Sequence, residues 1–276
     1  MSIRYLKIHK KPIIFLRLFG VSVAQFTEIL TKVNPEWYKH IISRYKRPGR
    51  PSDLDLADMI LMLLLYYRSY ITQEFVGYLF NLDKSQVCRI IQKLEPILAK
   101  VMAISKTKKL SQEEVEHLLI DATEQPIERP KKQQKPYYSG KKKRHTIKTQ
   151  VTVTLKGRIT AVSKPRPGSV HDFTIFKQSP PLPPDTTAFV DSGYQGIDKL
   201  HSHAEFPYKA RKTKLLDKEE KEYNRALSRI RVKVENILGQ IKVFRILSER
   251  YRNKRRRYGL KFNIIAGIVN LKNGFA

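Results

Sequence analysis

The order of apolar runs between residues 117 and 249 constrains the fold more than any other feature of the sequence. Two patterns alternate there: short runs typical of strands, and the periodicity of amphipathic helices. In chain order they predict a strand at residues 117–123, strands at 146–155 and 159–162, a short helix at 169–176, a strand at 187–190 and one long helix at 217–249. Strands interleaved with helices in this order predict an α/β sheet.

Residues 1–104 lack this alternation and predict an all-α region instead. Helical periodicity places helices at residues 22–30, 37–44, 53–67, 72–80 and 84–98. Ser22 and Gln25 form a capping box, so the basic and apolar N-terminal stretch is interpreted as a helix start and not as a secretory signal. The sequence therefore predicts two domains, residues 1–104 and residues 105–276, in a cytoplasmic protein.

Charge narrows the choice of partners. The chain of 276 residues carries 54 Lys and Arg against 25 Asp and Glu, a formal net charge of +29. A surplus of this size repels itself in the folded state and suits a polyanionic partner. The single cysteine, Cys88, excludes a disulfide framework and a Cys-based zinc site. No apolar run reaches the ~18 residues of a membrane-spanning helix, so no membrane partner is expected.

Residues 72–98 have the spacing of a helix-turn-helix. Gly77 is small where the two helices cross, and Asn81 tolerates the left-handed backbone of a tight turn. The second helix then points four side chains outward, able to contact phosphates and base edges: Lys84, Gln86, Arg89 and Lys93. A helical hairpin of an ordinary all-α domain has the same spacing, but the basic outer face favours DNA contact.

Three other segments are basic. Residues 129–171 hold 13 Lys or Arg and no Asp or Glu, and Lys141 and Lys142 lie in a hairpin-like loop of this stretch. The charge bias of the whole chain favours a nucleic-acid track there over a solvated charge run. A second basic patch covers residues 245–261. Arg50 lies in a Gly-Arg-Pro sequence similar to a minor-groove hook, with a basic linker as the alternative.

Three carboxylates stand on three different elements. Asp121 and Asp191 each end an apolar strand, and Glu235 lies with Arg231 and Lys242 along one edge of the long helix's apolar stripe. Carboxylates that converge from separate elements are what divalent ions need for phosphodiester cleavage or transfer. Turn chemistry for the two aspartates and an ordinary i,i+4 pair between Arg231 and Glu235 are the alternatives.

Four motifs follow one another in the second half of the chain. They are Ile120–Thr123, Pro167–Asp172, Phe189–Gly196 and Arg231-x₃-Glu235-x₆-Lys242, and Asn263–Lys272 accompanies them near the C-terminus. Together, behind a helix-turn-helix, they resemble a DDE-superfamily insertion-sequence transposase. The resemblance is closest to the bacterial group related to the Harbinger-type nucleases and runs from about Ser22 to Phe275.

The resemblance implies an RNase H-like catalytic core, a mixed sheet flanked by helices. It implies Asp121, Asp191 and Glu235 as the catalytic and metal-binding triad, with Mg²⁺ or Mn²⁺ as the cofactor. Two ions are expected, one to activate the attacking oxygen and one to stabilise the leaving oxygen. Arg231 and Lys242 match the basic positions that flank the family's glutamate, and both are expected to contact DNA. The implied partner is double-stranded DNA, both element ends and target, bound by a homo-oligomer.

His171 and Asp172 match a His-Asp pair of the family and are kept as auxiliary residues, with Asp172 as a possible additional metal ligand. Ser169 and Asp172 also have the spacing of a helix N-terminus, with Asp172 in a capping position. The two interpretations predict different partners for the Asp172 carboxylate, a metal ion in one and backbone N–H groups in the other.

The sequence as a whole predicts a metal-dependent transposase of the bacterial cytoplasm, associated with the nucleoid. It would recognise element ends by its helix-turn-helix, cleave DNA and transfer the freed strand. A domesticated endonuclease that cuts without joining is one alternative. A catalytically inactive, sequence-specific DNA-binding protein is the other, and the intact triad argues against it.

Overall fold

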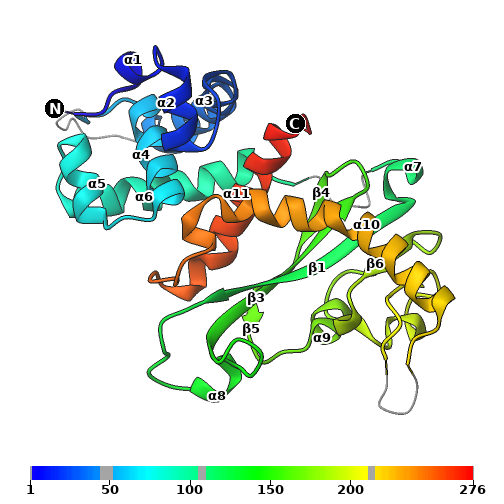
Figure 1. Ribbon diagram of the computed structural model, residues 1–276. Coiled ribbons are helices and arrows are strands. Elements are labelled where there is room, and N and C mark those ends of the chain that lie inside the picture. Colours follow the sequence, from blue (N-terminus) through cyan, green and yellow to red (C-terminus); the bar gives the residue numbers. More distant parts are fainter. Residues whose placement is uncertain (1, 44–51, 105–109, 211–214, 276) are drawn as a thin grey trace. The chain divides into compact units, whose positions relative to one another are not determined.

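The computed structural model describes residues 2–43, 52–104, 110–210 and 215–275 (Figure 1). The chain divides into two compact units. The first contains residues 1–103, 242–249 and 260–272, and the second contains residues 104–241, 250–259 and 273–276. Two C-terminal segments thus group with the helical N-terminal unit, whereas the sequence analysis assigned them to the second domain.

The first unit is built from helices. Its elements are α1 (Tyr5–Ile8), α2 (Pro12–Phe19), α3 (Val23–Trp37), the π-helix η1 (Tyr38–Ile42), α4 (Leu56–Ser69), α5 (Gln73–Phe80), α6 (Lys84–Val101), the 3₁₀ turn η5 (Arg245–Leu247) and most of α11 (Tyr258–Lys272). The predicted capping box is present, since Ser22 Oγ accepts a hydrogen bond from the backbone N–H of Gln25. The two helices expected at 22–30 and 37–44 are one helix that continues through Pro35 into η1.

Among the described residues, no single helix is both long enough and apolar enough to cross a membrane. The bent pair formed by α2 and residues 23–42 passes that test when the two are counted together, across a bend of 61°. Three phenylalanines of this pair, Phe15, Phe19 and Phe26, are fully buried in the first unit. Their rings contact one another, with centroids 4.8 Å apart for Phe15 and Phe19.

A buried ion pair ties the C-terminal helix to this unit. Lys261 Nζ of α11 lies 2.8 Å from Glu95 Oε1 of α6, and both side chains are almost completely buried. Tyr67 of α4 donates a hydrogen bond to the same carboxylate over 2.9 Å. A buried ion pair requires such additional hydrogen bonds to offset desolvation, and losing one partner costs about 3–5 kcal/mol. The contact therefore explains why α11 belongs with the N-terminal helices.

Helices α5 and α6 form the predicted helix-turn-helix. Asn81 adopts the left-handed conformation, with φ of 58°, immediately after α5. Asp83 and Gln86 then form a capping box at the start of α6. At Gly77 the helices approach so closely that an added Cβ would lie 2.4 Å from the carbonyl oxygen of Leu82. The roles expected for Gly77 and Asn81 are confirmed.

The second unit is a mixed sheet with helices. Its strands are β1 (His117–Pro126), β2 (Tyr138–Ser139), β3 (Arg144–Thr154), β4 (Ile159–Val162), β5 (Arg166–Pro167), β6 (Thr187–Val190) and β7 (Ala204–Glu205). Its helices and helical turns are α7 (Gln112–Val115), α8 (Gln134–Tyr137), α9 (Asp172–Lys177), η3 (Ser192–Tyr194), η4 (Ile197–Lys199), α10 (Lys218–Lys242) and η6 (Arg255–Arg257). The predicted α/β class is confirmed, and β4 and β6 have the expected bounds.

Strand β1 organises this sheet. It lies between β3 and β6 in the strand order β2-β3-β1-β6-β7, and β4 and β5 also pair with β3. The pairing of β1 with β3 is antiparallel along almost the whole strand, from Leu118 to Pro126. The pairing with β6 is parallel and ends at Ile120 opposite Val190. Beyond Ile120, β1 therefore has a paired neighbour on the β3 side alone among the described strands.

The long helix is shorter than expected. The apolar stripe of α10 is buried at Leu227, Val234 and Ile241, as its periodicity predicts, but the helix ends at Lys242 and not at residue 249. Phe244 takes up an extended backbone, with φ of −81° and ψ of 101°, and its side chain is completely buried. The apolar pattern of the sequence continues to residue 249, but burial of this ring in the first unit ends the helix earlier.

Replacing Gly77 with alanine tests the helix-turn-helix geometry. We expect Gly77→Ala to lower the free energy of unfolding by about 1–3 kcal/mol, because the added Cβ meets rigid backbone and not a movable side chain. Gly239→Ala in α10 is the control: nothing lies within 4 Å of its added Cβ, so alanine should stabilise by up to about 1 kcal/mol. Urea unfolding followed by circular dichroism measures both, and equal stability of the two variants would contradict the close crossing.

Candidate active site

Asp121 and Asp191 come together at the point where parallel pairing stops. The last residue pair of the two parallel strands is Ile120 in β1 with Val190 in β6. Asp121 directly follows the first of these residues, and Asp191 directly follows the second. The carboxylates are held locally: Asp121 Oδ1 accepts from the N–H of Ala122 over 2.8 Å, and Asp191 Oδ1 from the N–H of Ser192. Neighbouring strands are about 4.8 Å apart, so strand pairing alone places the two residues side by side.

The electrostatics of Asp121 reflect this crowding. The pKa of its carboxyl is raised from 3.8 to about 6, with burial as the largest cause and the negative charges of Asp191 and Asp172 as smaller ones. The Ala122 N–H and the Arg231 guanidinium act in the opposite direction and are outweighed. Three aspartates close enough to perturb one another form a site of negative potential in the middle of β1, where its pairing with β6 stops. The expectation that Asp121 ends its strand is therefore wrong, because β1 continues to Pro126 along β3.

Two cations from other elements offset these carboxylates. Arg231 Nη1 of α10 lies 3.8 Å from Asp191 Oδ1, and Lys148 Nζ of β3 lies 2.9 Å from Asp172 Oδ1. Both cationic side chains are largely buried, which strengthens their interaction with the carboxylates. We call this group the aspartate cluster: Asp121, Asp172 and Asp191 with Lys148 and Arg231.

His171 and Asp172 occupy other positions than the capping interpretation required. Helix α9 begins at Asp172, with His171 as its N-cap residue, and the His171 side chain makes no capping hydrogen bond. Ser169 lies before the helix, where its N–H donates to Pro136. The capping interpretation of Asp172 is therefore wrong. Its carboxylate is directed to Lys148 because β3 brings that ammonium group next to the helix start.

The structure adds residues that the sequence analysis did not single out. Tyr194 is fully buried and donates a hydrogen bond to Gln150 Oε1 over 3.2 Å. Burial, followed by the charges of the three aspartates, raises the pKa of this phenol well above its ordinary value. Gln150 and Lys148 lie on the polar parity of β3, although that strand is buried on both faces. Polar residues at strand positions that are expected to be buried were the sequence signal that could have identified Gln150 and Lys148 as site residues.

Backbone at Gly193 completes the support of the site. A Cβ added there would lie 2.7 Å from Asp172 Oδ2. The loop that follows Asp191 thus packs directly against the Asp172 carboxylate. A Cβ at residue 193 would force that carboxylate to shift from its position beside Lys148, and glycine avoids this shift.

Glu235 lies outside the aspartate cluster. It is exposed on α10, one turn after Arg231, and it is Arg231 that contacts Asp191. The ion pairs of the described residues do not include one between Arg231 and Glu235, which was the alternative interpretation. In the part of the chain that the structure describes, no three His, Cys, Asp or Glu side chains are grouped closely enough to hold a metal ion. The role of Glu235 as the third metal ligand remains a prediction.

The aspartate pair nevertheless fits a hard divalent cation. Carboxylate oxygens are the ligands that Mg²⁺ and Mn²⁺ prefer, and Mg²⁺ needs few protein ligands because it keeps several waters. The negative charges of Asp191 and Asp172 contribute to the raised pKa of Asp121, after burial as the largest cause. A bound cation would relieve that repulsion, so the donor set suits a divalent ion at Asp121 and Asp191.

The residues expected to contact DNA are distributed over both units. Lys84, Arg89 and Lys93 are exposed on α6, whereas Gln86 is half-buried and accepts the Asp83 N–H with its side-chain oxygen. Lys141 and Lys142 are exposed in the turn between β2 and β3, a short antiparallel hairpin. Lys242 is the exposed last residue of α10. Arg50 lies outside the described residues.

The fold and site together define a class. A helix-turn-helix precedes a mixed sheet in which carboxylates and cations gather where the parallel pairing of β1 and β6 stops. This is the organisation of an enzyme that acts on DNA phosphodiesters. Known proteins agree: a profile for DDE superfamily endonucleases matches residues 120–270. A second profile, for the helix-turn-helix of DDE superfamily endonucleases, matches residues 52–104.

Two curated relatives carry the same description. A probable transposase for insertion sequence element IS702 from Microchaete diplosiphon is 41% identical, over 93% of both chains. A putative transposase for insertion sequence element IS112 from Streptomyces albus G is 26% identical, over 83% of this chain and 84% of the relative. The chain therefore belongs to the DDE-superfamily transposases of insertion sequences. Membership implies an RNase H-like core and a divalent metal, and supports nuclease activity.

The raised pKa of Asp121 gives a stability prediction. A folded-state pKa of about 6 against 3.8 means that the carboxyl stabilises the fold below pH 4, and this contribution is lost as the pH rises through 6. Asn cannot ionise and keeps the acceptor for Ala122. We expect Asp121→Asn to exceed wild type in stability by about 1–3 kcal/mol at pH 7 without metal, and to match it at pH 4. Urea denaturation at both pH values measures this; parallel pH profiles would contradict it.

Proposed function

We propose that this chain cuts DNA at the ends of an insertion sequence and joins the freed ends to target DNA, using Mg²⁺ or Mn²⁺, with two ions per site. The observation that carries the proposal is that Asp121 and Asp191 directly follow Ile120 and Val190, the last pair of the parallel strands β1 and β6. The proposed ligands are these two carboxylates and Glu235. Bound divalent ions would activate the attacking oxygen and stabilise the leaving oxygen of the phosphodiester.

The chain's own residues have distinct parts in this reaction. Asp121 would hold a cation as the carboxylate, because that is the ligating form. Arg231 and Lys148 supply positive charge beside the carboxylates and suit the non-bridging oxygens of a phosphate. The first phosphodiester cleavage frees a 3′-hydroxyl, and that hydroxyl then attacks a phosphodiester of the target, so no covalent protein–DNA bond is required.

The helix-turn-helix would recognise the element ends. Lys84, Arg89 and Lys93 are exposed on α6, the second helix of the motif, which in such motifs enters the major groove. Gln86 has its oxygen committed to the capping box, so only its amide N–H groups are left to contact a base. Two ends must meet for joining, which favours a homo-oligomer in the complex, and this function places the protein with the nucleoid in the cytoplasm.

A strand-transfer assay tests the catalytic assignment. The donor would be the DNA flanking this gene, with Mg²⁺ or Mn²⁺, and the variants Asp121→Ala and Glu235→Gln. We expect both variants to lose joined product by at least about 10³-fold while retaining end binding, because each removes a ligand for the charge of the transition state. Glu222→Gln, an exposed glutamate on the same helix, is the matched control and should retain full activity.

The outcomes separate the alternatives. Joined product in wild type that is lost in Glu235→Gln supports the triad, whereas full activity of Glu235→Gln removes Glu235 from it. Nicked donor without joined product would favour an endonuclease that cuts only. Specific end binding with neither nicking nor joining would favour an inactive DNA-binding protein.

A second test concerns the recognition helix. We expect Lys84→Ala at the start of α6 to reduce the magnitude of the slope of log K against log salt concentration for end binding by about one, since one phosphate contact is lost. Lys100→Ala in the last turn of the same helix removes the same charge away from the expected DNA face. Fluorescence anisotropy with end DNA measures both slopes, and equal reductions would contradict the assignment.

A further inference from the structure

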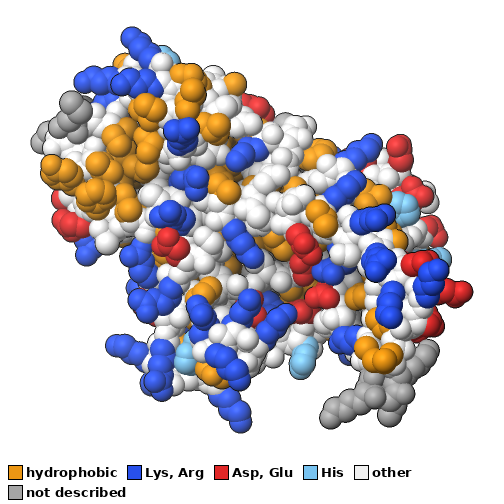
Figure 2. Space-filling view, viewed as in Figure 1, with side chains coloured by type: hydrophobic (Ala, Val, Ile, Leu, Met, Phe, Trp, Pro, Cys, Tyr) orange, Lys and Arg blue, Asp and Glu red, His pale blue; other side chains and the backbone are white. Residues whose placement is uncertain are grey.

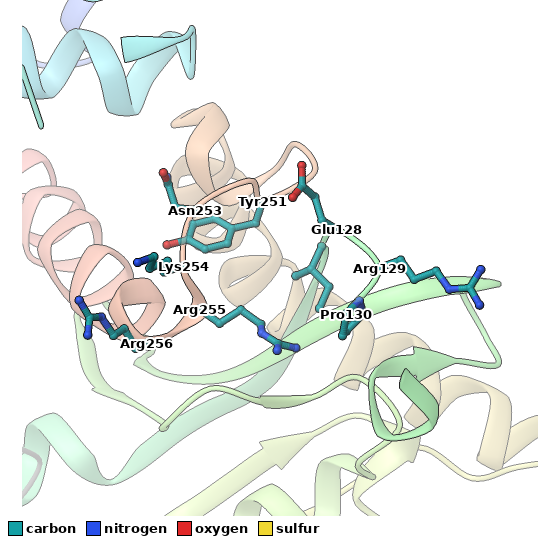
Figure 3. Close-up of a pocket in the computed structure, with 9 residues that line it drawn as sticks. Glu128, Arg129, Pro130, Tyr251, Asn253, Lys254, Arg255 and Arg256 are labelled. Carbon is teal, nitrogen blue, oxygen red and sulfur yellow. The ribbon is translucent and has the colours of Figure 1, made fainter. Parts of the chain in front are cut away.

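A hollow of about 420 Å³ lies in the second unit, beyond the end of β1 and separate from the aspartate cluster. Its walls are two chain segments far apart in sequence, residues 127–130 and residues 251–256 (Figure 3). The first segment leaves β1, and the second lies in the basic patch that follows α10. The proposed reaction uses neither segment.

Backbone contacts hold the two walls together. Ile127 and Tyr251 form a parallel bridge, and the N–H of Tyr251 donates to the carbonyl of Pro126 over 2.8 Å. Tyr251 is itself buried, with its ring edge-to-face against Tyr258 at a centroid distance of 5.0 Å. The floor is therefore part of the packed core, so side chains on the rim project from a rigid support.

The rim is strongly cationic. Four of the nine lining residues carry a positive charge and one carries a negative charge, Glu128. Lys254, Arg255 and Arg256 are exposed, and in the described part of the chain no salt bridge joins a carboxylate to any of the three. Unpaired cations concentrated on a rigid rim repel one another, and an anionic ligand would remove that repulsion.

Arg255 is held in a conformation suited to phosphate. Its guanidinium carbon lies 4.2 Å from the ring centroid of Tyr137 in α8. This cation–π contact holds the guanidinium over the ring, and the N–H groups directed away from the ring are able to donate to an oxyanion. In Figure 3 the Arg255 side chain extends toward Pro130, while Lys254 and Arg256 point to the other side of the loop.

This spread of cations favours an extended polyanion over a small one. The side chains fan outward and do not converge on one point. The basic residues 131–144 continue the positive surface through α8 and the β2–β3 hairpin. Figure 2 shows blue side chains gathered around that part of the second unit. A nucleic-acid backbone matches such a track.

The position of the rim sets a distance from the reaction. Six residues of extended chain separate Asp121 from Ile127, or about 20 Å at 3.3 Å per residue. That length corresponds to about six base pairs of B-form DNA, at 3.4 Å each. We infer that the rim formed by residues 127–130 and 251–256 is a clamp for the DNA backbone, with Arg255 bound to a phosphate about six nucleotides from the cleaved bond. The inference rests on the proposed function.

Salt dependence of duplex binding is the first test. The probe is a random-sequence duplex of about 30 base pairs, long enough to cover both sites. We expect Arg255→Ala/Arg256→Ala to reduce the magnitude of the log K against log salt slope by about two and to weaken binding about tenfold. The control Lys218→Ala/Lys221→Ala removes the same charge from exposed positions at the start of α10. An equal effect of both double variants would overturn the clamp in favour of diffuse charge.

Phosphate position is the second test. Single methylphosphonate groups, which remove one backbone charge, are placed in turn along an end duplex. We expect a substitution about six nucleotides from the cleaved bond to weaken wild-type binding and to have no further effect on Arg255→Ala. Arg255→Lys keeps the charge but loses the planar stack, so it should bind with the wild-type slope and a weaker footprint. A uniform effect at every position would overturn the inference.

The two failures are distinguishable. Wild-type protein that does not bind duplex DNA at all would overturn both the proposed function and the clamp. Strand transfer that depends on Asp121, combined with unchanged salt slopes in Arg255→Ala/Arg256→Ala, would overturn the clamp alone. Millimolar inorganic phosphate that abolishes the difference between wild type and Arg255→Ala, without a methylphosphonate footprint, would show a small-anion site and also overturn it.

Discussion

The pairing of β1 on both sides is the constraint on which the rest of the second unit depends. Antiparallel bonding to β3 runs nearly the full length of the strand, but parallel bonding to β6 ends at Ile120. Where the second partner stops, the sheet no longer covers the next residue with another strand, and Asp121 occupies that position. In the same register, Asp191 directly follows Val190, the last paired residue of β6. Backbone hydrogen bonds therefore place both carboxylates before any side-chain interaction contributes.

The negative charge of the aspartate cluster explains why two cationic side chains lie beside it. Carboxylates gathered where the parallel pairing of β1 stops repel one another, a cost that adds to burial in raising the pKa of Asp121. Lys148 and Arg231 reduce that cost from β3 and α10. The chain as a whole has the opposite excess, +29, and the helix-turn-helix and the rim near Arg255 carry part of it. Metal ions would compensate the first excess and DNA the second, so both partners act to stabilise the folded protein.

Local chemistry made several elements predictable. The left-handed Asn81, the close approach at Gly77 and the capping box at Ser22 depend on residues within a few positions of one another. Elements that depend on distant partners were not predictable in this way. Strand β1 extends to Pro126 through polar residues such as Gln125, although the apolar pattern that predicts the strand stops earlier. Gln125 is nevertheless buried, and it pairs with β3. The sequence places Lys261 in the basic patch of residues 245–261, yet its side chain is buried against Glu95.

The sequence by itself determined the α/β class, the helix-turn-helix and the family, because these are encoded in periodicity, turn residues and ordered motifs. Tertiary structure decided which charged groups face one another. It directs Asp172 to Lys148, places Arg231 beside Asp191 while Glu235 stays exposed, and brings Arg255 onto Tyr137. Those pairs join residues that are distant in sequence, so strand register and helix packing set their geometry, and neither is visible in the spacing of residues along the chain.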